Sequence, residues 1–267
     1  MIRVRLRAIG RRSFVSTKQR VMSTLNQKVV LVTGASGGIG AEISRGFAKA
    51  GAKVIVHYAG RKEPAEQVVS DIQKAGGEAF AIQADIRSSA EVRSLFDRSI
   101  AQYGRIDVVV NNAGIMVAKL IKDFTDEDFI NQVNINLNGA FFVLREAMAR
   151  VADNGSIIDI STSVNRVPIP TYGPYGATKS AIEHLTKVAA KEVGRGIRVN
   201  AVSPGPVNTE LYRKDKSPEM IARQAAMNPF NRIADPSDIA PVVVFLATDE
   251  AHWISGQVIP VNGAMLS

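Results

Sequence analysis

The chain has 267 residues, 46% of them hydrophobic, and a mean hydropathy of +0.03, which suits one large water-soluble domain with an ample core. No apolar run approaches the ~20 residues of a membrane span, so a membrane protein is not expected. The absence of cysteine excludes disulfides and thiolate chemistry, and three scattered histidines give no reason to expect a metal site.

The formal net charge of +8 comes almost entirely from the start of the chain. Seven basic residues lie at or before Arg20, and no acidic residue precedes Glu42. The rest of the chain is therefore near neutral, which argues against a nucleic-acid-binding protein.

Residues 1–22 form a basic arm that we exclude from the fold and expect to be poorly ordered. The arm is rich in arginine, contains serine and threonine and has no acid, which is the composition of a mitochondrial transit peptide. The alternative is that translation begins at Met22. Residues 23–267 form the expected domain, which we place in the cytoplasm, or in the mitochondrion if the arm is a transit peptide.

An apolar run at residues 28–33 predicts a first strand that is buried on both faces of a parallel sheet. A glycine-rich turn at residues 34–40 follows, and then a helical pattern. This is the context of a dinucleotide-binding loop, because glycines let the backbone approach a pyrophosphate and a helix N-terminus offers free N–H groups. The spacing is G-x-x-x-G-x-G, so an ordinary tight turn is the alternative. Ser36 would cap the helix or contact phosphate.

Residues 52–58 predict a second strand, whose end usually carries an acidic residue in proteins that select NAD. Here His57 and Tyr58 stand at that place, and the next ionisable groups are Arg61 and Lys62. A cation attracts the 2′-phosphate that a carboxylate would repel. We therefore expect NADP(H), with Arg61 as the main contact. The alternative is that both cations are solvated loop residues.

Two further strands end in polar side chains. The third, Glu78–Gln83, leads to Asp85, whose carboxylate would accept from an adenine amino group or cap the next helix. Residues 105–110 predict the fourth strand, and the sequence NNAG at residues 111–114 would line the adenosine cleft. Asn136 lies between two helical stretches in residues 119–150, and an amide in an apolar pattern needs a partner.

The fifth strand, Ser156–Ile160, is followed by a cluster of hydroxyls that includes Thr162 and Ser163. Tyr175 and Lys179 stand four residues apart in a helical pattern, so they share one face. A nearby ammonium would lower the pKa of the phenol from about 10 towards neutrality, where an acid–base catalyst works best. The alternative is an unrelated pair of surface residues.

The last third of the chain completes the sheet. Residues 198–202 predict the sixth strand, and PGPVNT at residues 204–209 is its loop. Residues 211–232 include Met220 and Met227 and predict either a mobile lid over a substrate or two surface helices. Residues 235–238 would cap another helix. Residues 257–261 predict the seventh strand, and residues 262–264 fit a sheet edge that packs on a second subunit.

Six motifs occur here in one order, namely TGASGGIG (residues 33–40), NNAG, Asn136, the hydroxyl cluster, Tyr175 with Lys179, and Pro204-Gly205. Together they resemble the short-chain dehydrogenase/reductase family over about residues 28–264, and especially its 3-oxoacyl-[acyl-carrier-protein] reductase-like group. The resemblance implies an α/β fold: a Rossmann-type doubly wound, mostly parallel seven-stranded sheet in a single domain, with helices on both faces. It also implies a homo-oligomer, a tetramer or a dimer.

The resemblance assigns roles to the motifs. Tyr175 would be the general acid in carbonyl reduction and the general base in alcohol oxidation, with Lys179 lowering its pKa and binding the nicotinamide ribose. Asn136 would hold a water of the proton relay. The family usually has serine where this chain has Thr162, next to Ser163, so either hydroxyl would orient the carbonyl oxygen. From the motifs and the resemblance together, the residues expected to contact the cofactor are Gly34, Ser36, Gly38, Ile39, Gly40, Arg61, Asp85, Ile86, Asn112, Ala113, Gly114, Tyr175, Lys179, Pro204, Gly205, Val207 and Thr209.

The expected function is NADP(H)-dependent reduction of a ketone or aldehyde, 3-oxoacyl-like or another small apolar carbonyl, with NAD(H) the less favoured cofactor. An alcohol, sugar or steroid dehydrogenase on the same scaffold is the second reading, because a fold does not fix a substrate. A regulator that binds NADP(H) without turnover is the third. The tyrosine, lysine and asparagine argue against it, since a pure binder has no need of all three.

Overall fold

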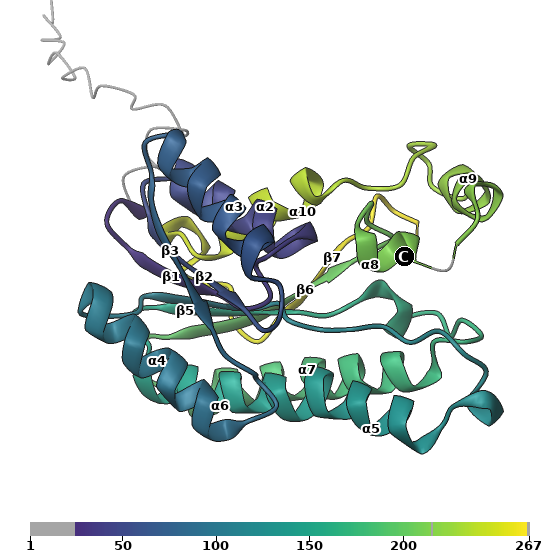
Figure 1. Cartoon of the computed structure of the whole chain (residues 1–267), viewed down its shortest axis with the longest axis horizontal. Coiled ribbons are helices and arrows are strands. Elements are labelled where there is room, and N and C mark those ends of the chain that lie inside the picture. The colour runs from purple at the N-terminus through teal and green to yellow at the C-terminus, as the bar shows by residue number, and fades with distance from the viewer. Residues whose placement is uncertain (1–24, 215, 266–267) are drawn as a thin grey trace, which may run out of the picture.

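One sheet of seven parallel strands forms the centre of the computed structural model, which describes residues 25–214 and 216–265 (Figure 1). The expected doubly wound Rossmann-type sheet is confirmed, and every strand pair is parallel. The order across the sheet is β3-β2-β1-β4-β5-β6-β7. The strands are β1 (Val29–Val32), β2 (Lys53–Tyr58), β3 (Glu78–Gln83), β4 (Val108–Asn111), β5 (Ser156–Ile160), β6 (Arg198–Pro204) and β7 (Val258–Val261).

The strand order reverses between β1 and β4, and open α/β sheets bind ligands at such a switch point, outside the carboxyl ends of the strands. Strand β7 forms one edge of the sheet, as expected. The expected contact of residues 262–264 with a second subunit stays a prediction. The basic arm at residues 1–22 lies outside the described residues.

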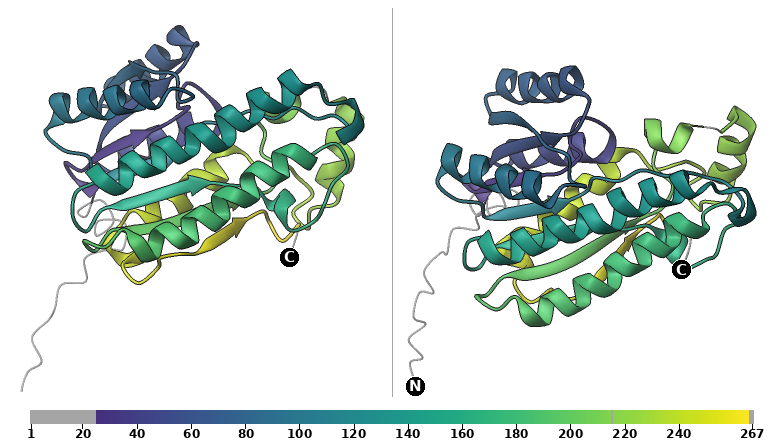
Figure 2. Two further views of the ribbon diagram at one scale, coloured as in Figure 1. Left: turned by 90° about the horizontal axis from the view of Figure 1, so that it is seen from below. Right: turned by 60° about the horizontal axis from the view of Figure 1, so that its bottom comes forward.

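Helices cover both faces of the sheet. Helices α2, α3 and α10 pack on one face, and α4, α6 and α7 pack on the other (Figures 1 and 2). The helices are α2 (Gly38–Lys49), α3 (Lys62–Lys74), α4 (Ser89–Tyr103), α5 (Asp126–Val133), α6 (Ala140–Arg150), α7 (Gly173–Glu192), α8 (Glu210–Arg213), α9 (Pro218–Ala226) and α10 (Pro236–Leu246). Among the described residues, no helix combines the length and apolar character that a membrane crossing needs.

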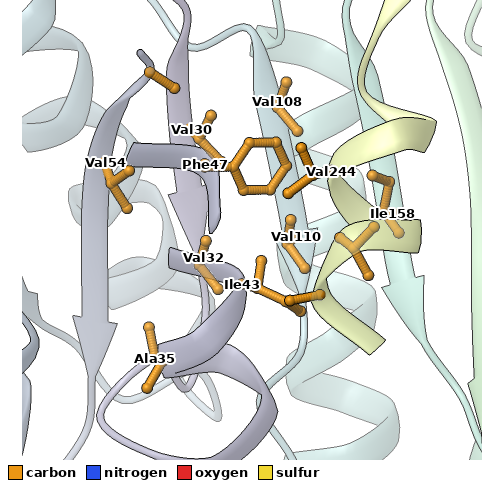
Figure 3. Close-up of a cluster of buried hydrophobic side chains, with 14 of the residues drawn as sticks. Val30, Val32, Ala35, Ile43, Phe47, Val54, Val108, Val110, Ile158 and Val244 are labelled. Atoms are coloured by element: carbon orange, nitrogen blue, oxygen red, sulfur yellow. The ribbon is translucent and has the colours of Figure 1, made fainter. Parts of the chain in front are cut away.

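Continuous apolar strands explain this layered arrangement, because a strand covered by helices on both sides has no polar face. All four residues of β1 are buried, and they alternate between two separate cores. On one side Phe47 of α2 packs with Val30 and Val244 (Figure 3). On the other side Leu31 packs with residues of α4, α6 and α7.

Local signals set the ends of two helices. Ser88 caps α4, since its Oγ accepts a hydrogen bond from the backbone N–H of Glu91. The cap predicted for Asp85 is therefore wrong. The predicted cap at residues 235–238 is confirmed, because Asp235 and Asp238 form a reciprocal capping box at the start of α10.

The connections at the carboxyl ends of the strands build the functional region. The predicted lid residues form α8 and α9, which lie beyond the ends of β6 and β7 (Figure 1). A stretch of π-helix, η2 (Asn134–Gly139), joins α5 to α6. Such π-helical turns are uncommon and often occur at functional sites. The remaining elements are short 3₁₀ helices, η1 (Ile121–Asp123), η3 (Ser163–Asn165) and η4 (Asp249–Ala251).

Candidate active site

Two adjoining cavities lie at the carboxyl ends of the strands. The larger has a volume of about 610 Å³ and lies between the glycine loop, the end of β2 and α8. The smaller, of about 390 Å³, lies between β5, the start of α7 and the α8–α9 segment. The two cavities adjoin, because five residues line both: Ile39, Asn112, Gly114, Thr209 and Leu211.

The glycine loop is shaped by close backbone contacts. Gly34 has a φ of 63°, and a Cβ there would lie 2.8 Å from the Cα of Ala113. Asn112 fixes the loop to β4 because its Nδ2 donates to the carbonyl oxygens of Thr33 at 2.9 Å and Gly34 at 3.1 Å. Only glycine fits at residue 34, and the backbone is thereby exposed to the larger cavity.

This cavity fits a dinucleotide. Helix α2 begins beside this cavity, its N-cap residue is Gly37, and no side chain caps the helix by a hydrogen bond. Ser36 lines the cavity and does not cap the helix, so the capping interpretation of Ser36 is wrong. Free N–H groups at a helix N-terminus favour a phosphate there, and residues 34–40 themselves contain no acidic residue.

The structure brings nearly all of the expected cofactor residues to these two cavities. Those that line the larger one are Gly34, Ser36, Gly38, Ile39, Arg61, Asp85, Ile86, Asn112, Ala113, Gly114 and Thr209. Those that line the smaller one include Tyr175, Lys179, Pro204, Gly205 and Val207. Gly40 lines neither cavity. It lies behind the loop, where a Cβ would meet the Nδ2 of Asn112 at 2.5 Å, so its role is close packing.

Two charged residues at the far end of the larger cavity have partners. Arg61 follows β2 as expected, and its guanidinium pairs with the carboxylate of Glu210 on α8. Asp85 is held by the guanidinium and backbone N–H of Arg87, which keep the pKa of its carboxyl below its usual range. The carboxylate of Asp85 still lines the cavity.

His57 positions the glycine-rich turn at residues 34–40 through contacts that the sequence did not reveal. Its Nδ1 accepts a hydrogen bond of 3.1 Å from the backbone N–H of Gly34, and its Nε2 lies 3.0 Å from the carbonyl oxygen of Ala84. The neutral tautomer with a proton on Nε2 satisfies both contacts. Burial lowers the pKa of His57 to about 4, so the ring is neutral at physiological pH. The imidazole therefore ties the glycine loop to the end of β3.

The smaller cavity has an apolar and aromatic lining. Tyr172 and Tyr175 lie edge to face with ring centroids 6.3 Å apart. Tyr212 of α8 lines the same cavity. Met227, which follows α9, also lines it and Met220 does not, although both side chains are exposed. The lid residues therefore do cover this cavity, and their mobility stays a prediction.

Tyr175 and Lys179 lie on one face of α7, as their spacing predicts, and both line the smaller cavity. The ammonium group of Lys179 is buried and donates to the carbonyl oxygen of Ile160 at 2.7 Å. The two side chains thus reach the same cavity from adjacent turns of one helix.

The expected lowering of the Tyr175 pKa is wrong for this geometry. Burial raises the pKa of Tyr175 to about 12, and the hydrogen bond with Thr162 offsets only part of this effect. The ammonium of Lys179 is directed to the backbone of β5, and burial lowers its own pKa to about 8. At neutral pH the phenol is therefore protonated, which is the form that donates a proton.

The structure distinguishes the two candidate hydroxyls. Thr162 is hydrogen-bonded to the phenol of Tyr175. The Oγ of Ser163 donates to the carbonyl oxygen of Ser203 at 3.0 Å and accepts from the Nδ2 of Asn262 at 3.3 Å. The hydroxyl proton of Ser163 is therefore engaged in holding β5 to β6, while Thr162 faces the phenol.

Asn136 is fully buried in η2 and binds the segment after β4. Its Oδ1 accepts from the backbone N–H of Ile115, and its Nδ2 donates to the carbonyl oxygen of the same residue, both at 2.8 Å. A Cβ on Gly114 would lie 3.2 Å from this Oδ1 and 3.5 Å from the Nζ of Lys179. Asn136 and Lys179 therefore border the same space beside Gly114. The water that we expect Asn136 to hold stays a prediction.

Comparison with known proteins identifies the family. The family model described as enoyl-(acyl carrier protein) reductase matches residues 34–265. The chain belongs to the short-chain dehydrogenase/reductase family. A short-chain type dehydrogenase/reductase of Picea abies is 40% identical over 253 residues, which cover 91% of this chain and 93% of that protein.

Two further relatives of this short-chain dehydrogenase/reductase are informative. Versicolorin reductase of Emericella nidulans is 39% identical over 252 residues, which cover 90% of this chain and 96% of that protein. The crystal structure of a Burkholderia cenocepacia dehydrogenase with bound NADP has a TM-score of 0.87 and 32% identity, and covers 91% of this chain and 95% of that one. The protein is therefore an oxidoreductase with a nicotinamide dinucleotide as its cofactor.

A buried carboxylate lies beneath the lysine of this dehydrogenase/reductase. Asp159 of β5 is fully buried, and accepts from the Nδ2 of Asn111 at 2.9 Å and from the hydroxyl of Thr186 at 2.8 Å. Burial raises the pKa of Asp159 to about 6, while the charge of Lys179 acts in the opposite direction. The charge of Asp159 in turn raises the pKa of Lys179.

We expect Asp159→Asn to move the alkaline limb of the kcat/KM profile to lower pH by roughly one unit. Lys179 is charged below its pKa of about 8, and removing the carboxylate removes the interaction that raises this pKa. The amide can keep both hydrogen bonds, because the hydroxyl of Thr186 can accept from it while donating to the carbonyl oxygen of Ile182 at 2.9 Å.

The matched control is Glu183→Gln, which removes a carboxylate of α7 that binds Ser161 and Asn165 instead. Its pH profile is expected to match that of the unmodified protein. The pH dependence of kcat/KM measured for all three proteins decides the matter. An unshifted alkaline limb in Asp159→Asn would contradict the coupling.

Proposed function

We propose that the protein is an NADP(H)-dependent reductase of apolar ketones or aldehydes, with Tyr175 as the proton donor. The observation that carries this proposal is the position of the Tyr175 phenol. The phenol is protonated at neutral pH, is hydrogen-bonded to Thr162, and lines the apolar cavity that adjoins the larger cavity. A carbonyl oxygen placed in this cavity would be within reach of two hydroxyl groups, that of Tyr175 on α7 and that of Thr162 after β5.

The residues of the chain divide the reaction between them. When bound, the reduced nicotinamide supplies the hydride to the carbonyl carbon. Tyr175 donates its proton to the carbonyl oxygen as negative charge develops there, and Thr162 orients that oxygen by a hydrogen bond. Lys179 lines the same cavity with a buried ammonium, and we assign it to the binding of the nicotinamide ribose.

The apolar lining supports a bulky hydrophobic substrate. Tyr172, Tyr212 and Met227 line the smaller cavity together with Val164, Val167 and Ile169 from the loop before α7. The rings of Tyr172 and Tyr212 favour a flat or aromatic carbonyl compound as substrate, because aromatic rings stack on planar groups. The name of the Emericella nidulans relative, versicolorin reductase, is consistent with a reductase.

Arg61 supports the choice of NADP(H). It lines the end of the larger cavity, no carboxylate follows β2 directly, and the Burkholderia cenocepacia structure contains NADP. We expect Arg61→Ala to weaken NADPH binding by about 10- to 100-fold, because a charge-assisted contact to the 2′-phosphate is lost.

Titrations of NADPH and NADH, followed by nucleotide fluorescence, measure this effect. NADH affinity should change less than about two-fold, since NADH has no 2′-phosphate for a cation to contact. Equal losses for both nucleotides would show that Arg61 is not the selecting residue.

The proposed activity is tested by following NADPH absorbance with aromatic ketones, cyclic diketones, β-keto esters and aldehydes. We expect the highest kcat/KM with the aromatic and cyclic compounds. Tight binding of NADPH without consumption by any carbonyl would favour the NADP(H)-sensing regulator. Oxidation of sugars or alcohols as the faster reaction would favour a dehydrogenase acting in the other direction.

A further inference from the structure

The contact between Arg61 and Glu210 joins two parts of the site that are 149 residues apart in sequence. Arg61 precedes α3, at the end of the larger cavity, and its Nη2 lies 2.8 Å from where a Cβ on Gly37 would stand. Glu210 is the first residue of α8, and its carboxylate binds the Nη1 of Arg61. The side chains are 51% and 81% exposed, so both can exchange partners with a solute.

Helix α8 touches both cavities. Glu210 lines the larger cavity, Tyr212 lines the smaller one, and Leu211 between them lines both. Thr209 caps this helix, since its Oγ1 accepts from the backbone N–H of Tyr212 at 3.2 Å. Glu210 therefore lies on the same short helix as a residue that lines the smaller cavity.

The other charges around Arg61 do not offer it a second acid. Asp85 is held by Arg87, and Glu66 pairs with Lys62 at 3.5 Å. Lys214 at the end of α8 is an exposed cation that lines the same cavity. Within the described residues, Glu210 is thus the acidic side chain that pairs with Arg61.

We propose that Glu210 competes with the 2′-phosphate of NADP(H) for Arg61, and thereby sets how strongly the protein prefers NADP(H) over NAD(H). This rests on the proposed function, in which Arg61 recognises that phosphate. A phosphate monoester carries a charge of about −1.5 to −2 at pH 7, so it both displaces the carboxylate from Arg61 and repels it. NADH has no phosphate at that place, and the contact between Arg61 and Glu210 persists beside it.

The test compares Glu210→Gln with Glu63→Gln by direct titration of nucleotide binding, without a turnover assay. Both variants remove one negative charge. Glu210 is bound to Arg61, whereas Glu63 is close to Arg61 in sequence but lies outside the cavity lining. Glu210→Gln is expected to bind NADPH about three- to ten-fold more tightly and NADH with less than about two-fold change. Glu63→Gln is expected to leave both affinities within about two-fold, since, among the ion pairs of the described residues, Arg61 pairs with Glu210 and not with Glu63.

The same titrations in an Arg61→Ala background complete a double-mutant cycle. In that background Glu210→Gln should change NADPH affinity by less than about two-fold. The guanidinium for which the carboxylate of Glu210 and the 2′-phosphate compete is then absent. The proposal is overturned if Glu210→Gln leaves NADPH affinity unchanged or weakens it, if it tightens NADH equally, or if its full effect survives without Arg61. Failure of the unmodified protein to bind NADPH or NADH would instead refute the proposed function.

Discussion

Tyr175→Phe is expected to lower kcat/KM for carbonyl reduction by about 10³-fold, within the range that general acid catalysis contributes. The change removes the hydroxyl that lines the cavity and keeps the ring, which lies edge to face with Tyr172. The affinity for NADPH should stay within about two-fold, because the phenylalanine still fills the same space. Steady-state kinetics and a nucleotide titration on one preparation measure both quantities.

Tyr172→Phe is the matched control, since Tyr172 is a second tyrosine on the lining of the same cavity. Its hydroxyl has no place in the proposed proton transfer, so kcat should fall less than about ten-fold. If Tyr175→Phe keeps its turnover while Tyr172→Phe loses it, the proton donor has been misassigned.

Thr162→Val is expected to reduce kcat by about 10- to 100-fold with little change in NADPH affinity. Valine has nearly the shape of threonine but lacks the hydroxyl that is hydrogen-bonded to Tyr175. Thr162→Ser restores a hydroxyl at the same position and should recover most of the rate. Recovery by serine and not by valine distinguishes loss of the hydrogen bond from loss of packing.

Ser163→Ala serves as the comparison and should act on stability. Its hydroxyl donates to the carbonyl oxygen of Ser203, and leaving this buried acceptor unpaired costs about 1–3 kcal/mol of unfolding free energy. The turnover number of the folded variant should stay within a few-fold. A large loss of kcat in Ser163→Ala, with none in Thr162→Val, would reverse the assignment of the two hydroxyls.

The sheet and its polar edge could be predicted from sequence because the signals are local. Short, mainly apolar runs bounded by turns predicted the strands. The run at residues 28–33 contains β1, and the predicted strands Glu78–Gln83 and Ser156–Ile160 have the same bounds as β3 and β5. The carboxyl ends of parallel strands meet at one edge, so their polar residues could be placed together before any distance was known. The spacing of Tyr175 and Lys179 predicted their common helix face for the same local reason.

Other features depend on where a side chain points after the chain has folded. The ammonium of Lys179 binds the carbonyl oxygen of Ile160, so helical spacing alone gave the wrong direction for the Tyr175 pKa. His57 lies in an ordinary strand pattern, and only the tertiary fold brings it to the backbone of Gly34. Arg61 and Glu210 are 149 residues apart in sequence, so no local sequence pattern could predict that they pair.

The most direct test of the proposed chemistry is the transfer of deuterium to an aromatic ketone from NADPH that carries deuterium at both positions of carbon 4 of the nicotinamide. Mass spectrometry and NMR of the alcohol should find one deuterium on the carbinol carbon, in an amount equal to the NADPH consumed. With Tyr175→Phe, NADPH should still bind and almost no labelled alcohol should form. An alcohol without deuterium, or no alcohol from any carbonyl while NADPH binds tightly, would contradict the assignment of this protein as a reductase.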